Sequence, residues 1–249
     1  MHPEETHRAQ LLSTSHALHA RGWVANHDGN ASVMLEEGRF LATPTAVSKG
    51  AVTAESLIVV SAEGKVLSGT RKLFSEWKLH AAAYAVRGDV RAVLHAHPPT
   101  ATGLAVAGVS LGEPFMAEPI VSLGRHIPTV SFGLPGENDA SLAEALSQAD
   151  ALLLENHGAL TVGPDLETCL LRMELLEHLC RIYVVAAQLG GPRRLPEALV
   201  AKLHEQHEKL FPRVITGASE ALQFGAAPAS PAPVGSARDI VAEALRRIG

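Results

Sequence analysis

Val93-Leu94-His95-Ala96-His97-Pro98-Pro99 is an apolar run that ends in two histidines and is then stopped by two prolines. Residues two apart in an extended strand point to the same face of the sheet. A strand here would therefore place the imidazoles of His95 and His97 side by side at its end, as a metal site requires. Two histidines in a polar turn would explain the same letters equally well, because a zinc site needs three or four ligands. The rest of the chain must supply the missing ones.

Two other segments carry side chains that could complete such a site. Residues 150–158 predict a buried strand that ends in His157, beside a glycine. Residues 75–86 predict a helix with Ser75 as its N-cap and Glu76 in its first turn, where a carboxylate is favoured in any case. A strand-end histidine that bonds to the backbone is the alternative for His157. The candidate ligands of a divalent ion such as zinc are His95, His97, His157 and Glu76.

This set of ligands indicates a class of chemistry. A metal ion that holds the oxygens of a carbonyl substrate stabilises the enolate that forms when a neighbouring C–H or C–C bond breaks. The carboxylate of Glu76, close to the ion, could carry the proton. His80 lies four residues after Glu76 and so on the same face of the helix. We interpret His80 as a supporting or packing residue rather than a ligand, because it would compete with three strand-end histidines for one ion.

The composition is that of a compact globular protein. The 249 residues are 47% hydrophobic and 19% charged, and the formal net charge of −5 argues against nucleic acid or an anionic membrane as the main partner. Cys169 and Cys180 lie about three helical turns apart, which makes a disulfide between them implausible and fits a reducing compartment. The sequence contains no apolar run typical of a signal peptide or a membrane span, and we expect a cytoplasmic protein.

The chain alternates between helical and extended patterns, followed by a segment rich in alanine, proline and serine. Helices are expected over residues 4–20, 75–86, 100–107, 141–149, 165–189 and 195–211. Strands are expected over residues 32–35, 57–61, 66–67, 90–94, 121–123, 127–132, 150–157 and 159–162, with a turn at 133–136. We divide the chain into a domain over residues 1–225, a linker over 226–236 and a C-terminal helical tail over 237–249.

Several short motifs occur in an order and spacing that resemble one protein family. They are Gly29-Asn30-Ala31-Ser32, Thr43-Pro44-Thr45-Ala46, Ser75-Glu76-x3-His80, His95-x-His97 and Asn156-His157-Gly158. The family is that of the class II aldolases and adducins, whose best-known enzymes are fuculose-phosphate aldolase and ribulose-phosphate 4-epimerase. The resemblance extends over about residues 8–190 and rests on all of these motifs together.

The resemblance implies an α/β fold, a three-layer α/β/α sandwich with a central mixed sheet, for the domain over residues 1–225. It also implies a cyclic homotetramer with active sites at the subunit interfaces. The implied cofactor is a zinc ion, or another divalent metal such as Mn2+ or Co2+, held by His95, His97 and His157. Glu76 matches the family's catalytic acid–base residue, which can also contact the metal. The positions that match contacts to the substrate phosphate, or to an equivalent polar end, are Asn30, Thr45, Ala46 and Ser75.

The chain departs from the family's aldolases at three positions near the expected site. The aldolases have glycine where this chain has Ala46, and serine where it has Phe74. The sugar-phosphate aldolases also use a tyrosine, in the segment that here contains Phe115, to protonate the leaving oxygen. Phe115 cannot donate a proton, and Glu118 is a candidate replacement. These changes favour an unphosphorylated or more apolar substrate.

The sequence thus predicts a metal-dependent lyase of the aldolase type, which cleaves a hydroxylated carbonyl compound through a zinc-bound enediolate. The same site could instead decarboxylate or epimerise a hydroxy acid, a keto acid or a sugar derivative. A third interpretation is an adducin-like binding module without catalysis. We disfavour it, because such modules lose the metal histidines and this chain keeps all three. In each enzymatic case the expected partner is a small-molecule substrate.

Overall fold

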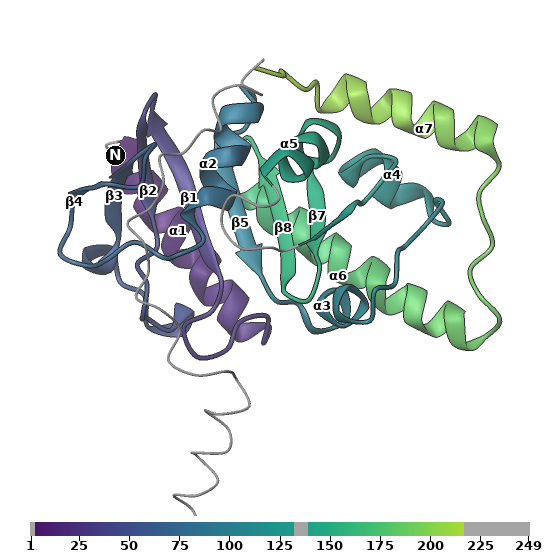
Figure 1. The fold of residues 1–249 in the computed structure, drawn as a ribbon, viewed down its shortest axis with the longest axis horizontal. Coiled ribbons are helices and arrows are strands. Elements are labelled where there is room, and N and C mark those ends of the chain that lie inside the picture. Colours follow the sequence, from purple (N-terminus) through teal and green to yellow (C-terminus); the bar gives the residue numbers. More distant parts are fainter. Residues whose placement is uncertain (1–2, 132–138, 217–249) are drawn as a thin grey trace, which may run out of the picture.

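The computed structural model describes residues 3–131 and 139–216, and the strands of this part form an eight-stranded sheet (Figure 1). The order across the sheet is β4-β3-β2-β1-β5-β8-β7-β6. The strands are β1 (Asn30–Glu36), β2 (Arg39–Ala42), β3 (Ile58–Ser61), β4 (Val66–Ser68), β5 (Ala92–Ala96), β6 (Thr129–Val130), β7 (Ala151–Leu154) and β8 (Gly158–Gly163). Neighbours pair antiparallel except β6 and β7, which are parallel. The sheet is therefore mixed, as expected.

Helices cover both faces of this sheet. They are α1 (Pro3–Ala20), α2 (Trp77–Val86), α3 (Pro99–Val106), α4 (Ala117–Leu123), α5 (Asp139–Gln148), α6 (Leu166–Gln188) and α7 (Glu197–Leu210), with short 3-10 helices at η1 (Lys49–Ala51) and η2 (Ala54–Ser56). Buried side chains of α1, α3 and α6 belong to one core, and those of α2 and α5 to the other. Helix α4 packs against α6 and α7 (Figure 1). The order of layers is helix, sheet, helix, which confirms the predicted α/β/α sandwich.

The sheet separates two cores because successive strand side chains point to opposite faces. In β5, Val93 belongs to the core beneath α2 and α5, and Leu94 to the core beneath α1, α3 and α6. All residues of β5 are buried, since the strand lies in the middle of the sheet. A strand covered on both faces is apolar throughout, which explains the continuous apolar run before His95. The backbone that carries His95 is therefore fixed by hydrogen bonds to strands on both sides.

Two predicted strands differ from the observed elements. Residues 121–123 are the end of helix α4, which has Pro119 in its first turn and buries Ile120 and Leu123. Proline is tolerated there because the first turn of a helix needs no N–H bond. A short apolar run does not distinguish a strand from a buried helix turn, which explains the error. Within the described residues, the strand expected over 127–132 is confined to Thr129–Val130.

Two boundaries matter for the site. Helix α2 begins at Trp77, with Glu76 at the N-cap position and Ser75 exposed before it, so Ser75 is not the predicted cap. Glu76 makes no side-chain hydrogen bond to cap the helix, so its carboxylate is available for other partners. The strand predicted over 150–157 ends at Leu154, and the chain turns back into β8. His157 consequently lies in a hairpin turn rather than on a strand.

Three expectations fall outside the described residues. They are the turn at 133–136, the linker over 226–236 and the helical tail over 237–249. The division of the chain into domain, linker and tail therefore stays a prediction. Among the described helices, none combines the length and the apolar character needed to cross a membrane.

Candidate metal centre

The end of β5 and the turn between β7 and β8 bring three histidines together. His95 lies in β5, His97 directly follows that strand, and His157 lies in the turn. Because β5 pairs antiparallel with β8, with Ala96 opposite Ala159, the end of β5 lies against the turn. One ring nitrogen of each histidine lies within 4.8 Å of the other two. The rings of His95 and His157 stack, with their centroids 4.7 Å apart. Two chain segments far apart in sequence thus supply three imidazoles to one point.

The residues on either side of His157 make this approach possible. A Cβ atom on Gly158 would lie 2.5 Å from Cδ2 of His97 and 2.7 Å from the carbonyl oxygen of Ala96. No larger residue fits there unless the backbone moves. Asn156 has a φ of 55°, in the left-handed region that asparagine adopts more readily than most residues. The Asn156-His157-Gly158 motif is therefore the local requirement for placing an imidazole beside the end of β5.

His95 is held in the form that binds a metal. Its Nδ1 lies 2.9 Å from the carbonyl oxygen of Ala159, so Nδ1–H donates and the lone pair of Nε2 faces the cluster. Burial lowers the pKa of His95 to about 4, with His157 and His97 acting in the same direction and Glu76 opposing them. Burial also lowers the pKa of His97, helped by His157. Both rings are therefore neutral at neutral pH, and neutral imidazoles are metal ligands.

Glu76 joins the cluster from the start of α2. Its Oε1 lies 2.7 Å from Nε2 of His157, and its Oε2 lies 3.4 Å from Nε2 of His95. The side-chain amide of Asn30 donates to Oε2 over 2.6 Å. Burial acts to raise the pKa of Glu76, but the hydrogen bond from His157, the positive charge that His95 gains when it is protonated at low pH, and the hydrogen bond from Asn30 lower it to about 2. Glu76 is therefore an ionised carboxylate that could bind a cation or accept a proton.

The predicted substrate-binding residues divide into two groups. Asn30 begins β1 opposite His95 and is buried against Glu76, so it belongs to the cluster itself. Thr45 and Ala46 lie on the loop after β2, and Ser75 lies on the loop before α2. A backbone hydrogen bond of 2.9 Å from the Thr45 N–H to the carbonyl oxygen of Lys72 joins these loops. The two loops therefore lie next to each other, close to the start of α2.

Ala46 occupies a backbone conformation that suits glycine better. Its φ is 57°, in the left-handed region, where a Cβ atom costs about 1–2 kcal/mol. Glycine adopts this conformation without that cost. The side chain at this position is exposed. Alanine in place of the glycine of the family's aldolases therefore changes the surface of the loop and strains its backbone, while the turn itself is retained.

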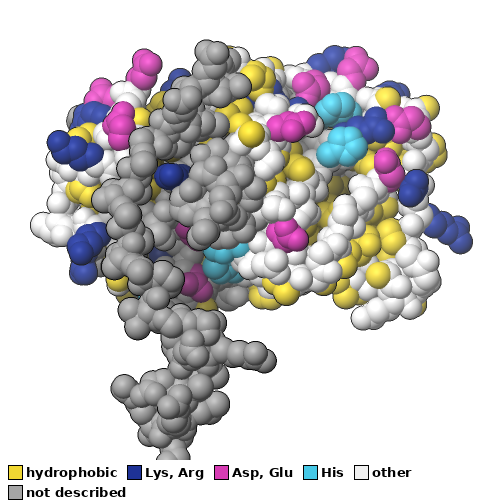
Figure 2. Space-filling model, viewed as in Figure 1, with side chains coloured by type: hydrophobic (Ala, Val, Ile, Leu, Met, Phe, Trp, Pro, Cys, Tyr) yellow, Lys and Arg dark blue, Asp and Glu magenta, His cyan; other side chains and the backbone are white. Residues whose placement is uncertain are grey.

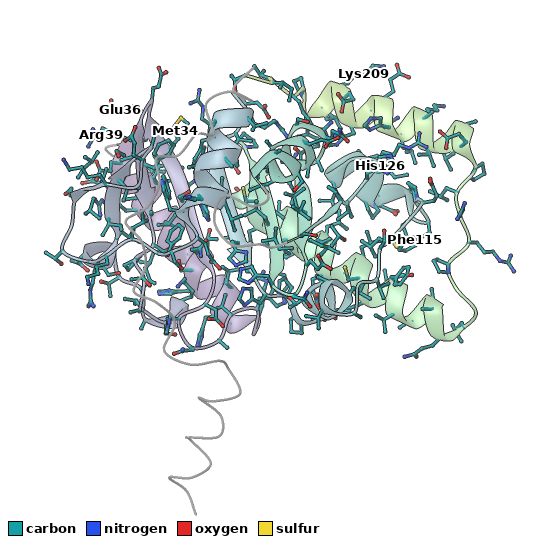
Figure 3. All side chains as sticks on the ribbon, viewed as in Figure 1. Met34, Glu36, Arg39, Phe115, His126 and Lys209 are labelled. Carbon is teal, nitrogen blue, oxygen red and sulfur yellow. The ribbon has the colours of Figure 1, made fainter. Side chains whose placement is uncertain are left out.

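The two phenylalanines singled out in the sequence have different surroundings. Phe74 is buried, with its ring centroid 4.9 Å from His80 and 6.1 Å from Trp77. Phe115 packs against Tyr183 of α6, at 5.8 Å between centroids, on the side of the molecule that carries α4 (Figure 3). Within the described residues, neither Phe115 nor Glu118 belongs to the histidine cluster.

Two charged residues near the site were missed by the sequence analysis. Lys49 is buried, and its ammonium donates to the carbonyl oxygens of His27 and Val47, at 3.2 Å each. Burial lowers the pKa of Lys49 to about 8, against the opposing charges of Asp28 and Glu76. An Asp28 carboxylate oxygen lies 3.8 Å from Nδ1 of His97. Neither residue has a distinguishing sequence signal, because a lysine or aspartate in a polar loop is usually exposed.

The model of the class II aldolase and adducin N-terminal domain matches residues 9–184, which is most of the chain. The chain belongs to the class II aldolase and adducin family. Its relatives include the 3-oxo-tetronate 4-phosphate decarboxylase of Pectobacterium atrosepticum, which is 31% identical over 73% of this chain and 85% of that protein. The L-fuculose phosphate aldolase of Escherichia coli is 28% identical over 74% of this chain and 85% of that protein. The family predicted from the motifs is confirmed.

Solved structures of class II aldolase family members have the same fold. The crystal structure of YgbL from Escherichia coli, described as a putative aldolase, epimerase or decarboxylase, superposes with a TM-score of 0.74 at 28% identity, over 81% of this chain and 99% of that one. The structure of an L-fuculose 1-phosphate aldolase also superposes with a TM-score of 0.74, at 26% identity, over 82% and 96%. Aldolases and a decarboxylase among the relatives agree with both the predicted activity and its alternative, and they support a lyase.

Proposed function

We propose that this family member is a metal-dependent carbon–carbon lyase of the aldolase type, acting on a hydroxylated carbonyl compound. The observation that carries the proposal is the convergence of His95, His97 and His157 with the ionised carboxylate of Glu76 beside them. The relatedness to an L-fuculose phosphate aldolase supports the same reaction class. The same donor set supports zinc as the proposed metal, and we disfavour the adducin-like binding module because the complete set of histidines is present.

The donor set fits a zinc ion. The imidazoles of His95, His97 and His157 could hold the ion and leave a position open for a substrate oxygen. Mn2+ or Co2+ could use the same imidazoles. When bound, a divalent ion supplies a Lewis acid, which polarises the substrate carbonyl and stabilises the negative charge that develops beside it. His95, His97 and His157 would hold the ion, and Glu76 could contact it before substrate arrives.

Glu76 is the proposed acid–base residue. It is ionised and lies against the histidines, so it can accept a proton from a substrate held at the same point and return it to carbon. The amide of Asn30 holds one oxygen of this carboxylate. Asn30, Thr45, Ala46 and Ser75 are the proposed contacts to the polar end of the substrate. Phe74 and Ala46 favour an end without phosphate, because each offers less to a phosphate group than the serine or glycine of the family's aldolases.

Decarboxylation is the alternative with a specific observation in its favour. Aldol cleavage requires two proton transfers: one removes the proton of a substrate hydroxyl, and the other adds a proton to carbon. Loss of carbon dioxide requires only the transfer to carbon. Phe115 stands where the sugar-phosphate aldolases have a tyrosine, so this chain has one proton carrier fewer. The relatives that are named as 3-oxo-tetronate 4-phosphate decarboxylases support this alternative. Epimerisation would use the same metal and the same carboxylate.

The metal and the reaction can be tested together. We expect purified protein to contain about one divalent ion per chain, and the double variant His95→Ala/His157→Ala to contain none, because each change removes an imidazole ligand. Turnover should be measured by release of aldehyde and of carbon dioxide from paired phosphorylated and unphosphorylated ketoses and 3-keto acids. Chelation should abolish turnover, and added Zn2+ should restore it. A native protein that is fully active without metal would overturn the proposal.

The outer surface of α6 supports the proposed homotetramer. Leu171 and Val185 of α6, and Leu189 directly after it, are apolar and exposed, and spacings of 14 and 4 residues place them on one side of the helix. Leu171 and Val185 are each 57% exposed, and Leu189 is 82% exposed. Such a stripe is typical of a helix that packs against another helix. Figure 2 shows hydrophobic surface on the side of the molecule that carries α4 and α6.

We expect the native protein to elute as a tetramer in size-exclusion chromatography with light scattering. The double variant Leu171→Glu/Val185→Glu should dissociate to smaller species, because each carboxylate would be desolvated in a helix–helix contact. Lys202→Glu, on the exposed surface of α7, reverses a charge outside the stripe and should remain tetrameric. A monomeric native protein would contradict the proposal.

We also propose a cytoplasmic location, because Cys169 and Cys180 are buried free thiols.

A further inference from the structure

We propose that His80 is a positioning residue, the centre of a buried hydrogen-bond chain that runs from Tyr84 through Ser32 and Asn30 and fixes the carboxylate of Glu76. The inference rests on the proposed acid–base role of Glu76 and goes beyond it, because it assigns a function to His80, Ser32 and Tyr84, which are not among the proposed contacts to metal or substrate. Without this chain, His80 and Ser32 would simply be polar residues buried in a hydrophobic core.

The links among Tyr84, Ser32, His80 and Asn30 are short hydrogen bonds between buried side chains, and the last link reaches the partly buried carboxylate of Glu76. Tyr84 Oη lies 2.7 Å from Ser32 Oγ, and Ser32 Oγ lies 2.7 Å from Nδ1 of His80. Nε2 of His80 lies 2.6 Å from Oδ1 of Asn30, whose Nδ2 lies 2.6 Å from Oε2 of Glu76. Ser32 and His80 are completely buried, and Asn30 nearly so. Water therefore cannot substitute for any of these partners without a rearrangement.

The direction of each hydrogen bond follows from its neighbour. An ionised Glu76 only accepts, so the NH2 group of Asn30 must donate to it, which turns Oδ1 of Asn30 toward His80. Oδ1 only accepts, so Nε2 of His80 carries the hydrogen and Nδ1 is the acceptor. Ser32 must then donate to Nδ1, and its oxygen accepts from the hydroxyl of Tyr84. All the donors point the same way, toward the carboxylate.

The fold brings these residues into register from two elements only. Asn30 and Ser32 are two apart on β1 and point to the same face of the sheet. Glu76, His80 and Tyr84 are spaced four apart at the start and along one side of α2, so they share one face of that helix. One strand face against one helix face therefore produces an alternating ladder. A shift of either element by one residue would break every rung.

The ring of His80 is also fixed by packing. Its centroid lies 4.9 Å from that of Phe74 and 6.0 Å from that of Trp77, with the Trp77 ring nearly parallel to it. The imidazole cannot rotate without displacing these aromatic side chains. Phe74, which replaces a hydroxyl residue of the family's aldolases, thus acquires a structural role in this chain.

For catalysis, the chain determines which oxygen of the Glu76 carboxylate transfers the proton. Asn30 holds Oε2 of Glu76, so Oε1 is the oxygen directed at Nε2 of His157 and at the space beside the histidines. Proton transfer requires an approach of about 2.6–3.2 Å between heavy atoms, so a rotated carboxylate would be inactive. Loss of the chain should therefore lower kcat and leave substrate affinity nearly unchanged.

The first test needs no substrate and no variant. In 15N NMR spectra of the intact native protein, the ring of His80 should be neutral, with Nε2 protonated and Nδ1 unprotonated. The opposite tautomer would place the carbonyl oxygen of Asn30 against Glu76 and would overturn the proposal. Assignment can follow the through-bond correlations that connect the ring nitrogens to the backbone of His80.

The second test is a double-mutant cycle. His80→Phe keeps a ring between Phe74 and Trp77 but removes both nitrogens, and should lower kcat by about 10- to 100-fold with metal content and KM nearly unchanged. The probe reaction is exchange of the carbon-bound protons of dihydroxyacetone and of its phosphate in D2O. In a Glu76→Gln background, His80→Phe should lower the exchange rate hardly any further, because His80 acts only through Glu76.

A matched control separates positioning from general packing. His207→Phe makes the same substitution at another buried histidine, on α7, and should lower stability without changing the exchange rate. Additive effects of His80→Phe and Glu76→Gln would overturn the positioning role while leaving the proposed acid–base residue intact. Full exchange activity in Glu76→Gln alone would instead overturn the acid–base assignment, and with it the role of His80. If His80→Phe does not fold, the tautomer of His80 in the native protein decides whether the proposal stands.

Discussion

Replacement of Glu76 by glutamine is expected to lower kcat by about 10²- to 10⁴-fold, which is the usual contribution of a positioned acid–base group. Glutamine has nearly the same shape as glutamate but cannot accept a proton. The native carboxylate is ionised, with its pKa lowered to about 2, and lies 2.7 Å from Nε2 of His157. The three imidazoles are untouched by the change. We therefore expect metal content and KM to stay close to native values.

The measurement is steady-state turnover of the substrate identified from the ketose and keto-acid panel, together with metal analysis of the same preparation. Glu63→Gln is a suitable control, because Glu63 is an exposed carboxylate that bonds to Ser61 on the strand β3. It should be indistinguishable from the native protein. If Glu76→Gln kept full activity, another residue would have to carry the proton, and the proposed mechanism would be wrong.

Asp150→Asn is expected to cost about 3–5 kcal/mol of unfolding free energy, which is typical when one partner of a buried ion pair is neutralised. Asp150 is buried directly before β7, with Oδ1 2.8 Å from Arg87 and Oδ2 2.7 Å from Arg172. His207 lies 3.6 Å and Arg213 3.7 Å from the same carboxylate. Burial lowers the pKa of Arg172 even with Asp150 beside it. Neutralising Asp150 leaves that guanidinium without its counter-charge.

The position of Asp150 in the fold explains why the effect should be global. Arg87 follows α2 on one face of the sheet, and Arg172 belongs to α6 on the other, so one carboxylate connects both helical layers. Urea unfolding followed by circular dichroism should report the loss as a lower midpoint. Glu197→Gln breaks the exposed Arg125–Glu197 pair and should cost little, because water screens that pair. A similar small loss for Asp150→Asn would show that the buried cluster contributes no net stability.

The sequence was sufficient for the parts of the site that depend on local geometry. A strand with histidines two apart presents both on one face, and this alone predicted that His95 and His97 act together. The Asn156-His157-Gly158 motif predicted the position of His157, because turn-forming and small residues on either side allow a histidine to lie in a tight turn. The family resemblance added the order of the layers, which local patterns do not encode.

Errors arose where a short stretch is compatible with two structures. Residues 121–123 were expected as a strand and form the end of α4, because their apolar side chains suit either a sheet or a helix turn. Ser75 was expected as an N-cap and is exposed, while Glu76 takes that position and turns its carboxylate to the histidines. The N-cap preference is worth only about 1 kcal/mol, so contacts from the rest of the fold override it.

The sequence by itself determined which residues could bind a metal, because ligand chemistry and strand periodicity are properties of neighbouring residues. Only the tertiary structure decided what surrounds them. The pairing of β1 with β5 places Asn30 opposite His95, and the packing of α2 on β1 places His80 between Asn30 and Ser32. The same is true of the charges around Asp150. The Asn30–Glu76 and Arg87–Asp150 contacts join residues 46 and 63 positions apart, and no periodicity in a sequence reports which distant side chains will share a hydrogen bond.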